Sequence, residues 1–256
     1  MKVKLHGVHN CETLNTRLSC VIIDDVIALD AGSLTSGLTL EQQKNLEAVL
    51  LTHRHYDHIR DIPPFGMNLY LAGVNTDIYA LPEVIDLINS HFFSSSIYTN
   101  FPAEPEGNPT FRFNPIAPME SFKAAGHECL AVPVQHPAPT VGYQVTSPDA
   151  KIVFYTGDTG PGLAECWKRI SPQLLIIEVT ASNRYEQYCA DNGHLAPVLL
   201  KRELESFREV KGYLPDVITV HMSPEMESEI HPELAAVARE LECTIIPGSE
   251  GMEVDL

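Results

Sequence analysis

The segment Thr52-His53-Arg54-His55-Tyr56-Asp57-His58 follows directly on the apolar run Ala48-Val49-Leu50-Leu51. A short apolar run that ends in a polar segment is typical of a buried strand that leads into a loop. The polar segment carries three histidines and one aspartate, whose nitrogen and oxygen atoms suit zinc, manganese or iron. No helix face or half-buried strand gains stability from such a set. The sequence therefore predicts a metal site at the end of a strand, with ligands that could be divided between two ions.

Three further candidate ligands each follow an apolar stretch that predicts a strand. His136 comes after residues 130–134, Asp158 after residues 152–155 and His221 after residues 217–220. Side chains that follow neighbouring strands can converge on one point at the edge of a sheet. Together with the first segment they make five histidines and two aspartates, a suitable number for two metal ions about 3.5 Å apart.

The composition favours a globular chain with a substantial core. The chain has 256 residues, of which 44% are hydrophobic and 20% charged. It shows no polar linker, low-complexity run or repeat, so we expect a single domain over residues 1–256. No run of 18 apolar residues occurs, which predicts that no segment spans a membrane. The amino terminus lacks the apolar region of a signal peptide and the six cysteines form no CxxC pair, so a cytoplasmic location with reduced thiols is expected.

The charge of the chain limits its partners. Acidic residues outnumber basic ones 34 to 17, which gives a formal net charge of −17. A field of this sign repels nucleic acids on average, whereas bound divalent cations would offset the charge locally. The charge therefore disfavours a nucleic-acid partner and leaves a small anionic substrate open.

The pattern of elements indicates mixed sheets with helices outside them. Residues 19–23 and 26–29 predict a β-hairpin around Asp24-Asp25, and Thr39 predicts the N-cap of a helix over residues 40–46. Further strands are expected at residues 3–8 (at a sheet edge), 130–134, 141–145, 152–155, 174–178, 217–220, 244–246 and 252–254. Further helices are expected near residues 82–90, from Pro197 and from Pro232. Residues 62–74 and 92–109 are expected to be loops that set specificity, and residues 94–109 look like a surface loop.

The spacing His-x-His-x-Asp-His, followed by His136, Asp158 and His221, resembles that of metallo-β-lactamase-fold hydrolases over nearly the whole chain. The resemblance implies an α/β fold, the four-layer αβ/βα sandwich of two mixed β-sheets with helices on the outer faces. It also implies two divalent metal ions (Zn, Mn or Fe). In that family, His53, His55 and His136 would hold one ion, and Asp57, His58 and His221 the other. Asp158 would bridge both ions together with a hydroxide.

Two shorter stretches of sequence resemble one branch of this family in particular. Residues 157–160 (Gly-Asp-Thr-Gly) and 192–197 (Asn-Gly-His-Leu-Ala-Pro) resemble the phosphodiesterase branch, which includes class II cyclic-nucleotide phosphodiesterases and tRNase Z. Only 21 residues separate His136 from Asp158, which leaves no room for the tRNA-clamping arm of many tRNase Z enzymes. We therefore expect hydrolysis of a small phosphodiester, with a 3′,5′-cyclic nucleotide as one candidate. The oligomeric state is open, with a homodimer as one option.

Four further residues have expected roles around this site. His194 is the candidate general acid for an alkoxide leaving group, and with Asp57 it completes the expected catalytic pair. The alternative for His194 is a helix-start histidine bonded to a carboxylate such as Glu178. Arg184 is a candidate ligand for a phosphate oxygen or, equally, a partner in a surface ion pair. Asp30 lies in an Asp-x-Gly sequence that supports the first metal-binding loop in the family, and Glu178 is expected to have a similar supporting role.

Other classes of protein stay as alternatives. An acyl hydrolase of the same fold, such as a thioesterase, lactonase or β-lactamase, would use the same hydroxide and would not need His194. A redox di-iron protein is disfavoured because the known members replace one of these histidines by a carboxylate and depend on a flavin domain. A non-catalytic metal-binding protein is disfavoured by the complete ligand set.

Overall fold

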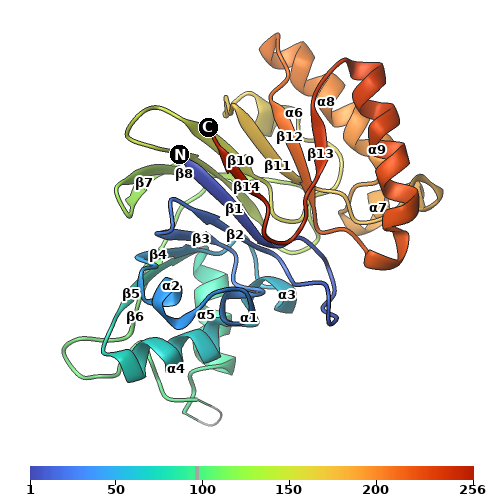
Figure 1. Cartoon of the computed structure of the whole chain (residues 1–256). Coiled ribbons are helices and arrows are strands. Elements are labelled where there is room, and N and C mark those ends of the chain that lie inside the picture. Colours follow the sequence, from blue (N-terminus) through green and yellow to red (C-terminus); the bar gives the residue numbers. More distant parts are fainter. Residues whose placement is uncertain (96–97) are drawn as a thin grey trace.

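Residues 1–95 and 98–256 are described by the computed structural model, in which two seven-stranded sheets lie face to face (Figure 1). The strand order in the first sheet is β14 (Glu253–Asp255), β1 (Lys2–Gly7), β2 (Cys20–Ile23), β3 (Ile27–Leu29), β4 (Ala48–Leu50), β5 (Thr76–Ala80), β6 (Phe111–Pro115). The order in the second is β13 (Ile245–Pro247), β12 (Asp216–Val220), β11 (Leu174–Glu178), β10 (Ile152–Tyr155), β9 (Val141–Thr146), β8 (His127–Pro133), β7 (Ser121–Ala124). Both sheets are mixed, because β3 to β6 and β10 to β13 pair in parallel and the other neighbours pair antiparallel.

The helices cover the outer faces of the two sheets and complete four layers, as Figure 1 shows. Beside the first sheet lie α1 (Leu34–Gly37), α2 (Leu40–Lys44), α3 (Tyr56–Ile59), α4 (Ile62–Ala72) and α5 (Pro82–His91). Beside the second lie α6 (Ala164–Trp167), α7 (Glu186–Asn192), α8 (Pro197–Lys211) and α9 (Glu227–Leu241), with the 3₁₀ turns η1 (Asn183–Tyr185) and η2 (Pro224–Met226). The predicted αβ/βα sandwich is confirmed. Within the described residues, no helix is both long enough and apolar enough to cross a membrane.

Alternation along the strands divides the core between the layers. In β11, Leu174 and Ile176 belong to the buried cluster that includes the facing sides of both sheets. Leu175 and Ile177 point the other way, into the cluster under α8 and α9. Successive side chains on a strand face opposite sides, so a strand buried on both faces is apolar throughout. This explains why residues 174–177 form an unbroken apolar run.

Two local predictions are confirmed by backbone geometry. Asp24 and Asp25 join β2 to β3 with φ angles of 50° and 59°, the left-handed conformation that a tight hairpin turn needs. Thr39 caps α2, because its hydroxyl accepts the backbone N–H of Gln42 while the Gln42 side chain accepts the Thr39 N–H. Both signals lie within a few residues of sequence, which is why they could be recognised there.

Three predictions were wrong. β1 is not an edge strand, because the carboxyl-terminal β14 pairs with its free side. Residues 62–74 were expected to be a loop, but most of them form α4, whose prolines lie in the first turn, where no N–H is needed. α9 begins at Glu227 and not at Pro232, which lies inside the helix. The expected surface loop at residues 94–109 contains residues 96–97, which lie outside the described residues; the rest of it forms turns and bends.

Trp167 anchors the layer between the second sheet and its helices. Its side chain is fully buried, with ring centroids 6.5 Å from Phe154 and 5.3 Å from Phe207. We expect Trp167→Ala to lower the free energy of unfolding by about 3–5 kcal/mol, through lost burial and the cavity left behind. Urea unfolding followed by circular dichroism measures this, with Trp167→Phe as the milder control. A loss below about 1 kcal/mol would show that the surrounding side chains collapse into the space.

Candidate metal centre and active site

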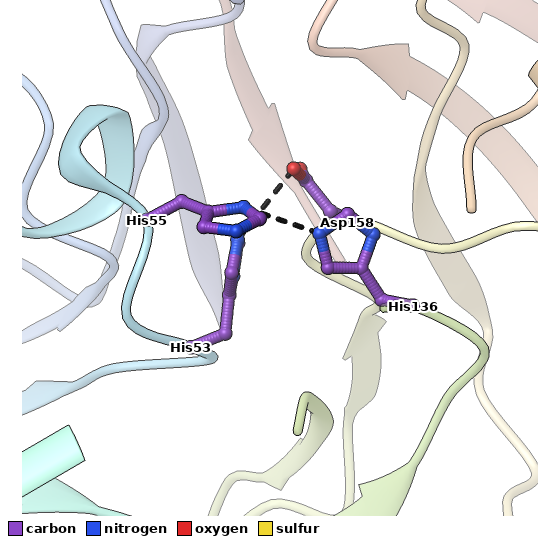
Figure 2. A group of neighbouring side chains, drawn as sticks. All are labelled: His53, His55, His136 and Asp158. Carbon is purple, nitrogen blue, oxygen red and sulfur yellow. Dashed lines mark hydrogen bonds and ion pairs between the residues drawn. The ribbon is translucent and has the colours of Figure 1, made fainter. Parts of the chain in front are cut away.

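The candidate site lies where several strands of both sheets end. The loop after β4 carries His53 and His55, and the loop after β8 carries His136. Asp158 follows β10, and His221 directly follows β12. Figure 2 shows His53, His55, His136 and Asp158 facing one another across the gap between these loops. The convergence expected from the sequence is therefore present.

Unusual backbone conformations aim two of these side chains. Gly157, directly before Asp158, has a φ of 60°, and a Cβ there would lie within 2.8 Å of the Thr52 side chain. Only glycine fits a position that combines this conformation with so close a contact. His221 itself has a φ of 64° although it is not glycine. Such strain at a histidine is typical of a functional position held by its surroundings.

The candidate ligands fall into two groups that share Asp158. His53, His55, His136 and Asp158 offer ligand atoms that all lie within 4.8 Å of one another, and so do Asp57, His58, Asp158 and His221. In the first group, His55 Nδ1 is 3.2 Å from His136 Nε2, and His53 Nε2 is 3.6 Å from Asp158 Oδ2.

The second group is equally compact. Asp158 Oδ1 lies 3.0 Å from His58 Nε2 and 3.3 Å from His221 Nε2, while Asp57 Oδ2 lies 3.1 Å from His221 Nε2. Ligands about 2.1 Å from a tetrahedral ion are about 3.4 Å apart, so these separations suit a shared cation. The set of imidazoles and carboxylates fits a divalent ion of the zinc, manganese or iron type.

Buried atoms without partners support this fit. His53 Nε2, His58 Nε2 and Asp158 Oδ1 are buried, and none makes a well-aligned hydrogen bond with a described residue; the 3.0 Å approach of His58 Nε2 to Asp158 Oδ1 is an ion-pair contact. Buried polar atoms are almost always paired, and leaving one unpaired costs about 1–3 kcal/mol. All three atoms point into the two ligand groups, where a cation would satisfy them.

Hydrogen bonds to Nδ1 of His53 and of His58 determine which nitrogen of each ring is available to a metal ion. His58 Nδ1 donates to Asp30 Oδ2 at 2.7 Å. Thr52 donates its hydroxyl to Asp30 and can accept the Nδ1–H of His53, which lies 3.0 Å away. Both histidines then present Nε2 to the site. Asp30 is fully buried and contacts both Thr52 and His58; its expected role in supporting the metal-binding loop stays a prediction.

The same arrangement recurs on the second sheet. His136 Nδ1 donates to the carbonyl of Gly193 at 2.9 Å. Thr180 donates its hydroxyl to Glu178 and can accept the Nδ1–H of His221 at 2.9 Å. Such partners orient a ligand ring and raise its basicity. Thr52 and Thr180 each lie two residues after a strand and Gly193 ends α7; none of the three was predicted to support a ligand.

Neighbouring charges shift the pKa values of several side chains in the site. Burial would lower the pKa of His58, but Asp158, Asp30 and Asp57 outweigh burial and hold that pKa well above its usual range. Burial would raise the pKa of Asp158, but His221, His58 and His53 hold it well below its usual range. Burial and the neighbouring imidazoles lower the pKa of His53. The carboxylates therefore stay ionised and provide the negative charge that a cation needs.

A cavity of about 430 Å³ opens over the second group. The most buried of its lining residues, Asp158 and His221, form its floor, and the more exposed Asp57 and His194 line it beside them. The lining is completed by Asn10, His55, Thr180, Ala181, Tyr185, Tyr188, Ser223 and Met226. This volume lies in the usual range for small-molecule sites.

His194 is held at this cavity by a buried acid. Its Nδ1 lies 2.7 Å from Glu178 Oε1, and its ring stacks on that of His221 with centroids 5.5 Å apart. Burial lowers its pKa, but Glu178 outweighs burial and raises the pKa to about 9. Glu178 also accepts the backbone N–H groups of Thr159 and Leu195, so it supports both neighbouring loops.

Arg184 is not brought to the cavity. Its guanidinium lies 3.2 Å from Glu229 and 4.9 Å above the ring of Tyr185, and 58% of its side chain is exposed. The surface ion pair, the alternative open from the sequence, is the observed arrangement.

His9 anchors the loop that brings Asn10 to the cavity. It is buried, with Nδ1 2.5 Å from Glu250 and Nε2 2.7 Å from Glu227. Burial lowers its pKa, but Glu250 and Glu227 outweigh burial and raise the pKa above the usual 6.5. A raised folded-state pKa gives stability that is complete below the unfolded pKa and is lost as pH rises through the folded one.

We therefore expect His9→Gln to flatten the pH dependence of stability above pH 6.5. The free energy of unfolding of the unchanged protein should fall more steeply between neutral and alkaline pH than that of the variant. Urea unfolding of the two metal-free proteins at a series of pH values gives the difference between their free energies of unfolding. The other histidines are common to both proteins, so their contributions cancel in this difference. Parallel curves would show that His9 is neutral in the folded protein.

The fold and the ligand geometry together define a metallo-β-lactamase-type protein. A family model described as a beta-lactamase superfamily domain matches residues 21–222, and the chain belongs to this family. No curated protein sequence matches the chain significantly.

Solved structures agree on the fold. The metallo-beta-lactamase fold protein YhfI from Bacillus subtilis has 18% identity and a TM-score of 0.79, covering 99% of this chain and 98% of that one. Unliganded yeast PDE1 has 17% identity and a TM-score of 0.83, covering 100% and 99%. The short form of human tRNase Z, ELAC1, has 16% identity and a TM-score of 0.74, covering 100% and 99%. At these identities the likeness shows the shared fold.

Proposed function

We propose that this chain is a binuclear metal-dependent hydrolase that cleaves a small phosphodiester, with 3′,5′-cyclic nucleotides as the first candidates. His53, His55 and His136 would hold one ion, Asp57, His58 and His221 the other, and Asp158 both. Bound there, two divalent ions would supply a nucleophile from water at neutral pH and neutralise phosphate oxygens. Asp57 would contribute to catalysis as the ligand at the open side of the cavity floor.

The observation that carries the phosphodiester proposal is the position of His194. It lines the cavity beside Asp57 and His221, and Glu178 occupies its Nδ1. The other ring nitrogen is then left to give a proton to a leaving group. A phosphodiester with an alkoxide leaving group needs such an acid, because an unprotonated alkoxide leaves poorly.

The connection between the ligand loops supports a small substrate. Ten of the 21 residues between His136 and Asp158 lie in β9 and β10, and these two strands are joined by residues 147–151 alone. No described element between them extends from the body to clamp a large RNA. The net charge of −17 adds to the case against a nucleic-acid substrate.

The experiment that tests the class uses the apo protein reloaded with zinc, manganese or iron. Hydrolysis of bis(p-nitrophenyl) phosphate is compared with hydrolysis of a thioester and of nitrocefin. Metal-dependent cleavage of the diester alone is the expected result. Cleavage of the thioester or the lactam alone would instead identify an acyl hydrolase and leave the pair of His194 and Glu178 as a structural contact.

A further inference from the structure

The outer wall of the cavity is aromatic, unlike its floor. Tyr185 and Tyr188 line it together with Met226 and Ala181. Tyr185 ends η1 and Tyr188 lies in the first turn of α7, so the two are three residues apart on one helical side. Their exposed fractions are 37% and 62%. Large aromatic side chains left open to solvent at a cavity mouth are characteristic of binding surfaces.

Contacts from α9 hold this wall in place. Ser182 donates its hydroxyl to Glu229 at 2.7 Å, and the backbone N–H of Asn183 donates to Glu233 at 2.8 Å. Arg184 joins Glu229 to the ring of Tyr185, on which its guanidinium lies. A wall that is fixed before a ligand arrives loses little entropy on binding.

Two polar side chains complete the same cavity. Asn10 and Ser223 line it, and neither side chain makes a hydrogen bond with a described residue. A free carboxamide offers two donors and one acceptor, which can pair with the edge of a heterocyclic base. An aliphatic group would make none of these hydrogen bonds, so the lining suits a planar, heterocyclic ligand better.

We propose that Tyr185, Tyr188 and Met226 form a subsite that stacks on the nucleobase of the substrate, while the phosphodiester reaches Asp57, Asp158 and His221. The inference rests on the proposed function and names its substrate as a nucleotide. Arg184 then acts as a positioning residue that supports Tyr185. An aromatic side chain can stack on any nucleobase, so the wall would select nucleotides as a class. Asn10 and Ser223 would contact the edge of the base.

Calorimetry on the zinc-loaded protein tests the subsite without turnover. We expect adenosine 5′-monophosphate to bind about 5- to 100-fold more tightly than ribose 5-phosphate, because only the first carries a base to stack. In Tyr188→Ala this ratio should fall towards one, with little change in the affinity for ribose 5-phosphate. Tyr188→Phe should keep the ratio, and Tyr188→Leu should lose most of it although it keeps an apolar side chain.

Tyr70→Ala is the control for the loss of a partly exposed tyrosine, since Tyr70 is 37% exposed but lies on α4, outside the cavity lining. Equal affinities for the two ligands in the unchanged protein, or a ratio unaffected by Tyr188→Ala, would overturn the subsite. Preference for the nucleotide in a protein that hydrolyses no diester would uphold the subsite and overturn the proposed reaction. Diester hydrolysis by a protein that binds adenosine 5′-monophosphate and ribose 5-phosphate equally would uphold the proposed reaction and overturn the subsite.

Discussion

Asp158→Asn is expected to lower hydrolysis of bis(p-nitrophenyl) phosphate by about 10³-fold or more. Asp158 is the one residue shared by the two ligand groups, with Oδ1 3.0 Å from His58 Nε2 and 3.3 Å from His221 Nε2. An amide has nearly the same shape but neither the charge nor the two equivalent oxygens. The variant should therefore bind fewer ions, which inductively coupled plasma mass spectrometry after dialysis measures beside the initial rate.

Asp86→Asn is a matched control, because Asp86 is an exposed acid on α5, far from the ligand loops in sequence. It should keep both the metal content and the rate of the unchanged protein. Circular dichroism should show that Asp158→Asn is folded, so that a loss of metal is not a loss of structure. Two ions per chain and an undiminished rate in Asp158→Asn would contradict the assignment of Asp158 as the shared ligand.

The candidate metal-ligand residues could be located at strand ends from the sequence because each signal is local; their role as ligands stays a prediction. An apolar run that ends in a polar residue marks a strand end, and this pattern holds for His53, His136, Asp158 and His221. Their convergence could be expected because parallel strands end at one edge of a sheet, as β10, β11 and β12 do. The hairpin at Asp24 was likewise a local signal.

The surroundings of the ligands could not be predicted in this way. The bond from His136 ends on the backbone carbonyl of Gly193, and every residue type has such a carbonyl. The aromatic wall at Tyr185 depends on how α9 packs against the loop before α7. The pairing of β1 with β14 joins residues from opposite ends of the chain, which no local pattern encodes. The sequence did not predict α4, because Pro63, Pro64 and Gly66 have low helix propensity. Tertiary packing outweighs this low propensity in the folded chain.

His194→Ala is expected to lower kcat for 3′,5′-cyclic AMP by about 10²- to 10⁴-fold, the usual contribution of a general acid. The same variant should change the rate on bis(p-nitrophenyl) phosphate far less, because p-nitrophenolate leaves without a proton. Metal content should not change, since His194 lies outside both of the ligand groups that share Asp158. Steady-state kinetics on both substrates, with metal analysis of each preparation, give the comparison.

The contrast between the two leaving groups separates a chemical role of His194 from a structural one. Because Glu178 also receives the N–H groups of Thr159 and Leu195, losing the contact with His194 could loosen both loops. Loosened loops would slow both substrates alike, whereas a missing acid slows only the alkoxide. Added imidazole should restore part of the cyclic AMP activity of His194→Ala, and His91→Ala, on α5, is a control for the loss of a histidine far along the chain. Equal losses on both substrates without rescue would assign His194 to the support of the loops and remove the main argument for a phosphodiester.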